Sequence, residues 1–163
     1  KLETQAVPGL GRLNRSGVGS STKAKEAMNT AFNYLEANYK SIDQRINADA
    51  RDFFVSATNL NNSAPSSHIS LATLIALVSI ALGKPTLDRL VILGDFTIGG
   101  TISRIDDLAD TLQVALDSGA KRVLLPAAAA SDISSVPTDL MSSFNLIFYN
   151  SVKDAAFKAL GVG

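Results

Sequence analysis

The chain has 163 residues, 46% of them hydrophobic, which fits one globular domain spanning residues 1–163 with a sizeable core. Its formal net charge is zero, so no global basic field attracts nucleic acid or an anionic membrane. The lack of cysteine and the single histidine, His68, exclude disulfides, thiolate metal sites and multi-histidine metal sites.

Membrane insertion and secretion have no support in the sequence. No apolar run reaches the ~20 residues that cross a bilayer, and residues 1–11 lack the apolar segment of a signal peptide. We therefore expect a cytoplasmic protein with no membrane partner. Because the chain begins with Lys1 rather than methionine, we expect it to be a fragment of a longer protein.

The first part of the chain predicts a strand, a helix and a second strand. Residues 5–13 are typical of a strand interrupted by a turn at Pro8-Gly9. A helix is expected at about residues 23–39, since alanines recur there at i, i+3 and i+4 behind a cluster of capping residues. Residues 52–57 predict a short strand, and residues 58–67, rich in Asn, Ser and Pro, predict a loop.

The middle of the chain contains the most apolar segment. Residues 69–82 predict a buried helix that stops at Gly83 and is followed by Pro85. Residues 90–102 indicate two strands joined by a tight hairpin turn at Gly99-Gly100. No helix follows that glycine pair directly, so it is not a phosphate-binding loop.

The last part alternates helices with strands. Asp106 and Asp107 are expected to begin a helix that runs to about Ser118, where acidic residues suit the helix dipole. The remaining pattern predicts strands at residues 122–126 and 145–149, with a small helical piece between them. A last helix is expected at residues 152–160. The fold class is therefore α/β or α+β with mixed sheets.

Motifs along the whole chain resemble the proteolytic domain of the Lon protease family. Residues 94–112 and 118–126 fit, without a gap, the family patterns G-E-[IV]-T-L-R-G-x-V-L-P-I-G-G-L-K-E-K-L and G-G-I-K-x-V-x-[IL]-P. Ala76-Leu-Val-Ser with Gly83-Lys-Pro resembles the helix end A-L-V-S…G-x-P, and Val7-Pro-Gly-Leu-Gly resembles the opening V-x-P-G-x-G. The resemblance implies the Lon proteolytic-domain fold, with small mixed sheets and flanking helices.

This resemblance also implies an activity and an assembly. Lon proteases use a serine nucleophile and a lysine base behind an AAA+ ATPase, in a hexameric ring. We accordingly expect a homo-oligomer, with ATP and Mg²⁺ in an ATPase domain outside this segment and no cofactor or metal within it. Within the family, the sequence is most similar to the Lon-like AAA+ proteins of bacterial BREX phage-defence systems. The Lon-like domain of RadA-type recombination and repair proteins is an alternative.

The position of the family's catalytic lysine is occupied by Ala109, and the two preceding glycines are replaced by Asp106 and Asp107. A lysine base has to be neutral and within reach of the serine hydroxyl, and alanine has no proton acceptor. Lys84 lies at the end of the preceding helix and Lys121 matches a non-catalytic lysine of the family, so neither replaces it.

The nucleophile is altered as well. The family has P-S-A-G before the buried helix, where this chain has Pro65-Ser-Ser-His-Ile-Ser. Anchored on Pro65 the serine is Ser66, whereas counting back from Gly83 places His68 there, flanked by Ser67 and Ser70.

Each of these residues has a structural interpretation beside the catalytic one. We favour helix capping for Ser66 and Ser67. His68 is expected as a surface residue of the first helical turn rather than a base, since only distant aspartates are available to orient it. The helix start explains Asp106 and Asp107 more simply than a paired-carboxylate site does.

Three functions follow. The first is a non-proteolytic Lon-like domain that serves ring assembly and contacts with DNA or a protein partner. The second is an active ATP-dependent serine peptidase whose base is His68, a group of a neighbouring subunit or another lysine, and the third is an interaction module without an enzymatic role. A basic cluster near the start of the chain is a candidate phosphate-contacting patch, although we favour a solvated charged face because the net charge is zero; the cluster comprises Arg12, Arg15, Lys23 and Lys25.

Overall fold

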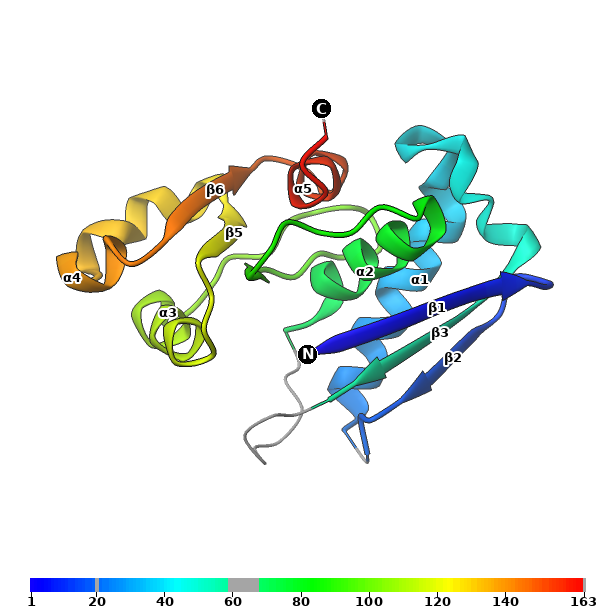
Figure 1. Cartoon of the computed structure of the whole chain (residues 1–163), viewed down its shortest axis with the longest axis horizontal. Coiled ribbons are helices and arrows are strands. Elements are labelled where there is room, and N and C mark those ends of the chain that lie inside the picture. The colour runs from blue at the N-terminus through cyan, green and yellow to red at the C-terminus, as the bar shows by residue number, and fades with distance from the viewer. Residues whose placement is uncertain (20, 59–67, 163) are drawn as a thin grey trace.

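The computed structural model describes residues 1–19, 21–58 and 68–162 (Figure 1). Helices alternate with strands along the chain, and the strands form two three-stranded sheets, which confirms the predicted α/β class. In chain order the elements are β1 (Leu2–Pro8), β2 (Leu13–Ser16), α1 (Thr22–Ile42), the 3-10 helices η1 (Gln44–Ile46) and η2 (Ala48–Ala50), β3 (Arg51–Ala57), α2 (Ser70–Leu82), β4 (Leu90–Ile92), α3 (Leu108–Asp117), β5 (Arg122–Pro126), η3 (Ala127–Ser135), α4 (Thr138–Met141), β6 (Asn145–Tyr149) and α5 (Val152–Ala159).

The first sheet is mixed and has the order β1-β3-β2, with β1 antiparallel and β2 parallel to β3. Alternate side chains of β3 point to opposite faces, as the period of a strand requires. Phe53 and Val55 are buried in the core, whereas Phe54 is 42% exposed on the other face. Helices α1 and α2 cover the buried face (Figure 1).

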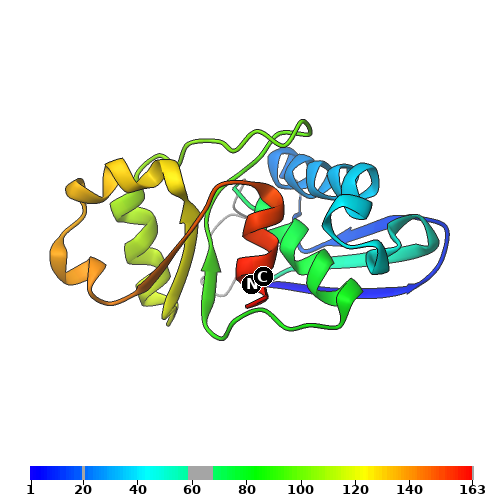
Figure 2. The same cartoon turned by 90° about the horizontal axis from the view of Figure 1, so that it is seen from above.

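The second sheet is wholly parallel, with the order β4-β5-β6. Its central strand is buried on both faces, as expected for a parallel sheet with helices on both sides. Leu124 belongs to the core cluster shared with α2 and α5, and Val123 and Leu125 belong to the cluster under α3. Helix α5 lies between the two halves of the molecule, as the red helix in Figure 2 shows.

The predicted capped start of α1 and the predicted stop of α2 are confirmed. Ser21 caps α1, accepting a hydrogen bond from the Ala24 N–H at 3.2 Å. Helix α1 runs past the expected end, to Ile42, where Asp43 turns to extended backbone. Helix α2 stops at Gly83, whose φ of 65° is the left-handed conformation that glycine adopts at no steric cost.

Two predictions about the middle of the chain were wrong. The expected hairpin of two strands is much shorter than predicted: β4 ends at Ile92, and the segment around the glycine turn pairs through one bridge, Phe96 with Ile102, flanked by the bonds Thr97 N–H to Thr101 and Ser103 N–H to Asp95. The third long helix begins at Leu108 rather than at the two aspartates. Asp107 has a φ of 51°, in the left-handed region, and therefore lies outside the helix.

Candidate functional site

The start of α2 is held by one carboxylate, that of Asp95. Its Oδ1 atom accepts hydrogen bonds from the Ser70 hydroxyl at 2.7 Å and from the Ser70 N–H at 3.3 Å. Its Oδ2 atom lies 2.6 Å from Nδ1 of His68. We call His68, Ser70 and Asp95 the helix-start cluster. A carboxylate at a helix N-terminus is favourable because it satisfies free N–H groups and complements the helix dipole.

The Ser70 hydroxyl is fully committed to this cluster. It donates to Asp95 and accepts a hydrogen bond from the Phe96 N–H at 3.1 Å, and the side chain is only 3% exposed. A hydroxyl that is buried and already engaged as both donor and acceptor is not accessible to a substrate. Ser70 is therefore a structural link between α2 and the segment after β4.

Two expectations about His68 were wrong. His68 precedes α2 instead of forming its first turn, and it has an orienting carboxylate. Asp95 is 27 residues away in sequence, but the fold brings it into contact. The imidazole remains 79% exposed, so it is oriented by Asp95 and open to solvent. The sequence did contain a signal for this partner: Gly94-Asp95 matches the G-E that opens the family pattern, so Asp95 keeps the acidic residue of that position.

Ser66 and Ser67, predicted as capping residues or a vestigial nucleophile, lie outside the described residues. The N-cap position of α2 is occupied by Ile69, which makes no side-chain capping bond. Asp95 supplies from another part of the chain the oxygen that a capping side chain provides locally.

A buried tyrosine supports the loop that carries Asp95. The Tyr149 hydroxyl donates to the Leu93 carbonyl at 2.8 Å, and Tyr149 is 1% exposed. A Cβ atom on Gly94 would overlap that hydroxyl, and Gly94 has a φ of 125°, so only glycine fits there. Burial raises the pKa of Tyr149, and the negative charge of Asp95 raises it further.

The other half of the family's dyad falls on α3. Ala109 lies in the first turn of that helix, half-buried against the core cluster under α3. Its methyl group adds apolar contact and offers no proton acceptor. Ala109 therefore belongs to the apolar face of α3.

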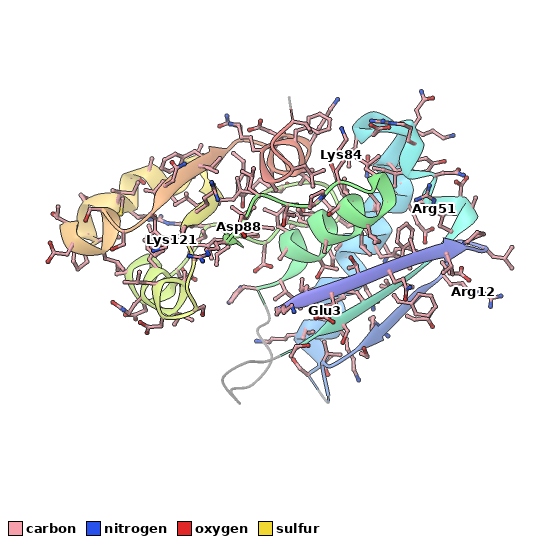
Figure 3. All side chains as sticks on the ribbon, viewed as in Figure 1. Glu3, Arg12, Arg51, Lys84, Asp88 and Lys121 are labelled. Atoms are coloured by element: carbon pink, nitrogen blue, oxygen red, sulfur yellow. The ribbon has the colours of Figure 1, made fainter. Side chains whose placement is uncertain are left out.

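The lysines considered as substitutes lie elsewhere. Lys84 follows the C-terminal end of α2, roughly 20 Å from its start at 1.5 Å per helical residue. Lys121 precedes β5, and its backbone N–H bonds to the Arg89 carbonyl at 3.0 Å. Figure 3 shows the two side chains well apart on different elements.

An open cavity of about 450 Å³ borders Ala109, and its polar lining is mainly acidic. Asp106, Asp107 and Asp110 line it. Asp107 is the N-cap residue of α3, at the helix start as predicted, but its side chain makes no capping bond. Within the described ranges, no group of three or more acidic or histidine side chains is arranged to hold a metal ion.

Membrane insertion can be examined over the same residues. Of the helices that the structure describes, none is long and apolar enough to span a bilayer.

Comparison with known proteins matches this fold over nearly its whole length. The pattern of the family described as "Lon protease (S16) C-terminal proteolytic domain" covers residues 1–161. Two proteins named Lon-like protease BrxL, from Bacillus cereus strain H3081.97 and Escherichia coli O9:H4 strain HS, are 43% and 44% identical over 99% of this chain. The Lon protease of Rhizobium meliloti strain 1021 is 29% identical over 90% of it. The chain spans 24%, 23% and 18% of these three relatives, about a quarter of their length or less.

Proposed function

Because the chain belongs to the Lon protease (S16) C-terminal proteolytic domain family, we propose that it is a Lon-type domain in which the Ser–Lys dyad has been lost. In this proposal the domain serves assembly and the handling of DNA or a protein partner. The parent protein is an ATP-dependent AAA+ protein of BREX phage defence that forms a hexameric ring. ATP and Mg²⁺ are bound by an ATPase domain outside this segment. The similarity to two Lon-like proteases named BrxL supports the assignment to this subgroup.

The observation that carries the loss of peptidase chemistry is Ala109. The family pattern aligns without a gap around it, and its side chain packs against apolar neighbours. A Ser–Lys peptidase needs an amine within hydrogen-bond reach of the serine. Ala109 supplies none, and Lys84 and Lys121 lie on other elements.

Covalent labelling tests this proposal directly. The parent protein is incubated with a fluorophosphonate probe, with the Rhizobium meliloti Lon protease as positive control. We expect label on the control and none on the parent protein. Ser66→Ala and Ser67→Ala are expected to leave its biological activity intact. Labelling of a serine, or loss of activity in a folded serine variant, contradicts the proposal.

A second function, an active serine peptidase, is favoured by one observation. The imidazole of His68 is held at 2.6 Å by Asp95, the arrangement that orients a histidine base in Ser–His–Asp enzymes. In this alternative His68 accepts the proton of a serine from a neighbouring segment or subunit. It predicts that a serine is labelled by the fluorophosphonate probe, and that His68→Ala lowers the rate of labelling at least about a hundredfold. The first proposal predicts no labelling in either protein.

DNA contact in the proposed assembly has a candidate surface on β2 and the start of α1. Arg15 donates to the Asn29 side chain at 3.0 Å, which fixes one guanidinium beside α1. Lys23 and Lys25 follow in the first turn of the same helix. If these residues contact phosphates, Arg15→Gln lowers the slope of log affinity against log salt by about one. If the domain instead belongs to a RadA-like recombination protein, the same salt dependence is expected, and only the partner protein differs.

A further inference from the structure

A second cavity, of about 460 Å³, lies beyond the carboxyl ends of the parallel strands β5 and β6. Pro126 and Tyr149, the last residues of these strands, both line it. The carboxyl end of a parallel sheet is where open α/β folds commonly place a ligand. Its polar lining consists of Ser103, Arg104, Ser131 and Asn150.

The lining of this cavity defines the chemistry of a ligand. Arg104 is the one charged side chain in it, and the hydroxyl and amide groups around it are neutral hydrogen-bonding partners. Ile102, Ala127 and Ala128 provide a small apolar wall. One guanidinium with neutral donors beside an apolar wall fits a monoanion with a small aliphatic body, and a carboxylate matches the fork of arginine best.

Arg104 separates this cavity from the acidic one beside Ala109. Its Nη2 atom lies 2.9 Å from Oδ1 of Asp132 on η3, and the side chains are 74% and 26% exposed. An exposed pair of this kind contributes little to stability, so an incoming carboxylate can take the place of Asp132. In the cavity beside Ala109, Asp106 and Asp107 repel an anion. An anion is therefore expected to approach Arg104 from the cavity that Ser103 lines.

We propose that the cavity at the ends of β5 and β6 binds a carboxylate with a small aliphatic body. Arg104 is its cation, and Asp132 is an internal competitor that occupies Arg104 when the cavity is empty. The ligand chemistry has two sources, the C-terminus of a polypeptide or a free short-chain carboxylate. Neither Ala109 nor His68 lines this cavity, although Arg104 also borders the cavity beside Ala109.

Fluorescence anisotropy of the chain with a labelled hexapeptide ending in Ala-Val tests this proposal. The same peptide with a C-terminal amide is the matched probe, and we expect it to bind at least about tenfold more weakly than the free acid. Competition by isobutyrate identifies a free carboxylate as sufficient, and no competition assigns the site to polypeptide C-termini.

The variants are expected to change affinity in opposite directions. Arg104→Gln loses about tenfold or more in affinity for the free acid, and Arg104→Lys retains part of it. Asp132→Asn releases Arg104 and raises affinity about threefold. Asp117→Asn removes the same charge away from both cavities and stays within about twofold of the parent. Equal binding of acid and amide, unchanged binding by a folded Arg104→Gln variant, or no gain in Asp132→Asn overturns the proposal.

Discussion

The starts of α2 and α3 correspond to the two halves of the family's dyad, and they are built in opposite ways. At α2, Asp95 and Ser70 form a saturated polar cluster that ties the helix to the segment after β4. At α3, Asp107 has left-handed backbone and makes no capping bond, while Ala109 packs against the core.

The comparison indicates what each start requires. The α2 start is held by hydrogen bonds from residues distant in sequence, so its geometry depends on the fold. The α3 start is held by apolar packing and by the bonds that the Thr111 N–H and hydroxyl donate to the Asp107 carbonyl, and neither depends on the polar side chains before the helix. Substitutions at the α2 start should therefore cost more stability than substitutions at the α3 start.

The largest effect is expected for Gly94→Ala, which breaks the support of the α2 start. The added Cβ overlaps the Tyr149 hydroxyl, and the φ of 125° is unfavourable for alanine. We expect a loss of about 3 kcal/mol or more in the free energy of unfolding, measured by urea denaturation. Gly119→Ala is the control, with a φ of 85° and no atom within 4 Å of the added Cβ, and should lose about 1 kcal/mol. Equal losses would show that the overlap is relieved without cost.

Ser70→Ala removes the link between α2 and the following segment. It leaves the buried Phe96 N–H without its acceptor, and Asp95 loses one of its donors. The expected loss is about 2 kcal/mol in the free energy of unfolding. Ser118→Ala deletes an exposed hydroxyl that bonds to the Val114 carbonyl and should cost less than about 0.5 kcal/mol. A cost for Ser70→Ala as small as that of the control would mean that water replaces the hydroxyl.

Alkaline pH should weaken the same region through Tyr149. Because the pKa of Tyr149 is raised in the folded state, the unfolded chain loses the phenol proton first. Its contribution is complete below about pH 10 and is lost as the pH rises above that value. Tyr149→Phe should cost about 1–2 kcal/mol at neutral pH and make thermal stability fall less steeply above pH 10. An unchanged slope in that variant would assign the alkaline loss to other tyrosines.

The smallest effect has the opposite sign and lies at the α3 start. Asp107→Gly relieves a left-handed backbone at φ 51°, and we expect a gain of about 0.5–1 kcal/mol in the free energy of unfolding. Asp110→Gly, within the helix, should instead lose up to about 1 kcal/mol. A loss in both variants would indicate that Asp107 contributes contacts that outweigh its backbone strain. Urea denaturation of both variants beside the parent chain measures this difference.

Local chemistry made several elements predictable from the sequence. Ser21 and Gly83 mark the ends of helices because a capping oxygen and a left-handed glycine act on their own neighbours. The pattern of apolar residues located α1, α2 and the strands β3, β5 and β6, whereas β2 was not predicted. Ala109 at the lysine position follows from counting residues within one uninterrupted motif.

The contacts that shape the α2 start could not be predicted in this way. His68 and Asp95 are 27 residues apart, and they meet because β4 enters a sheet whose other strands come later in the chain. The same packing places the Phe96 N–H against the Ser70 hydroxyl. The sequence alone determined most helices, the strands β3, β5 and β6, and the missing lysine, since these depend on neighbouring residues. Only the tertiary structure decided which carboxylate orients His68 and how Asp107 begins α3, because those depend on the free energy of packing distant segments together.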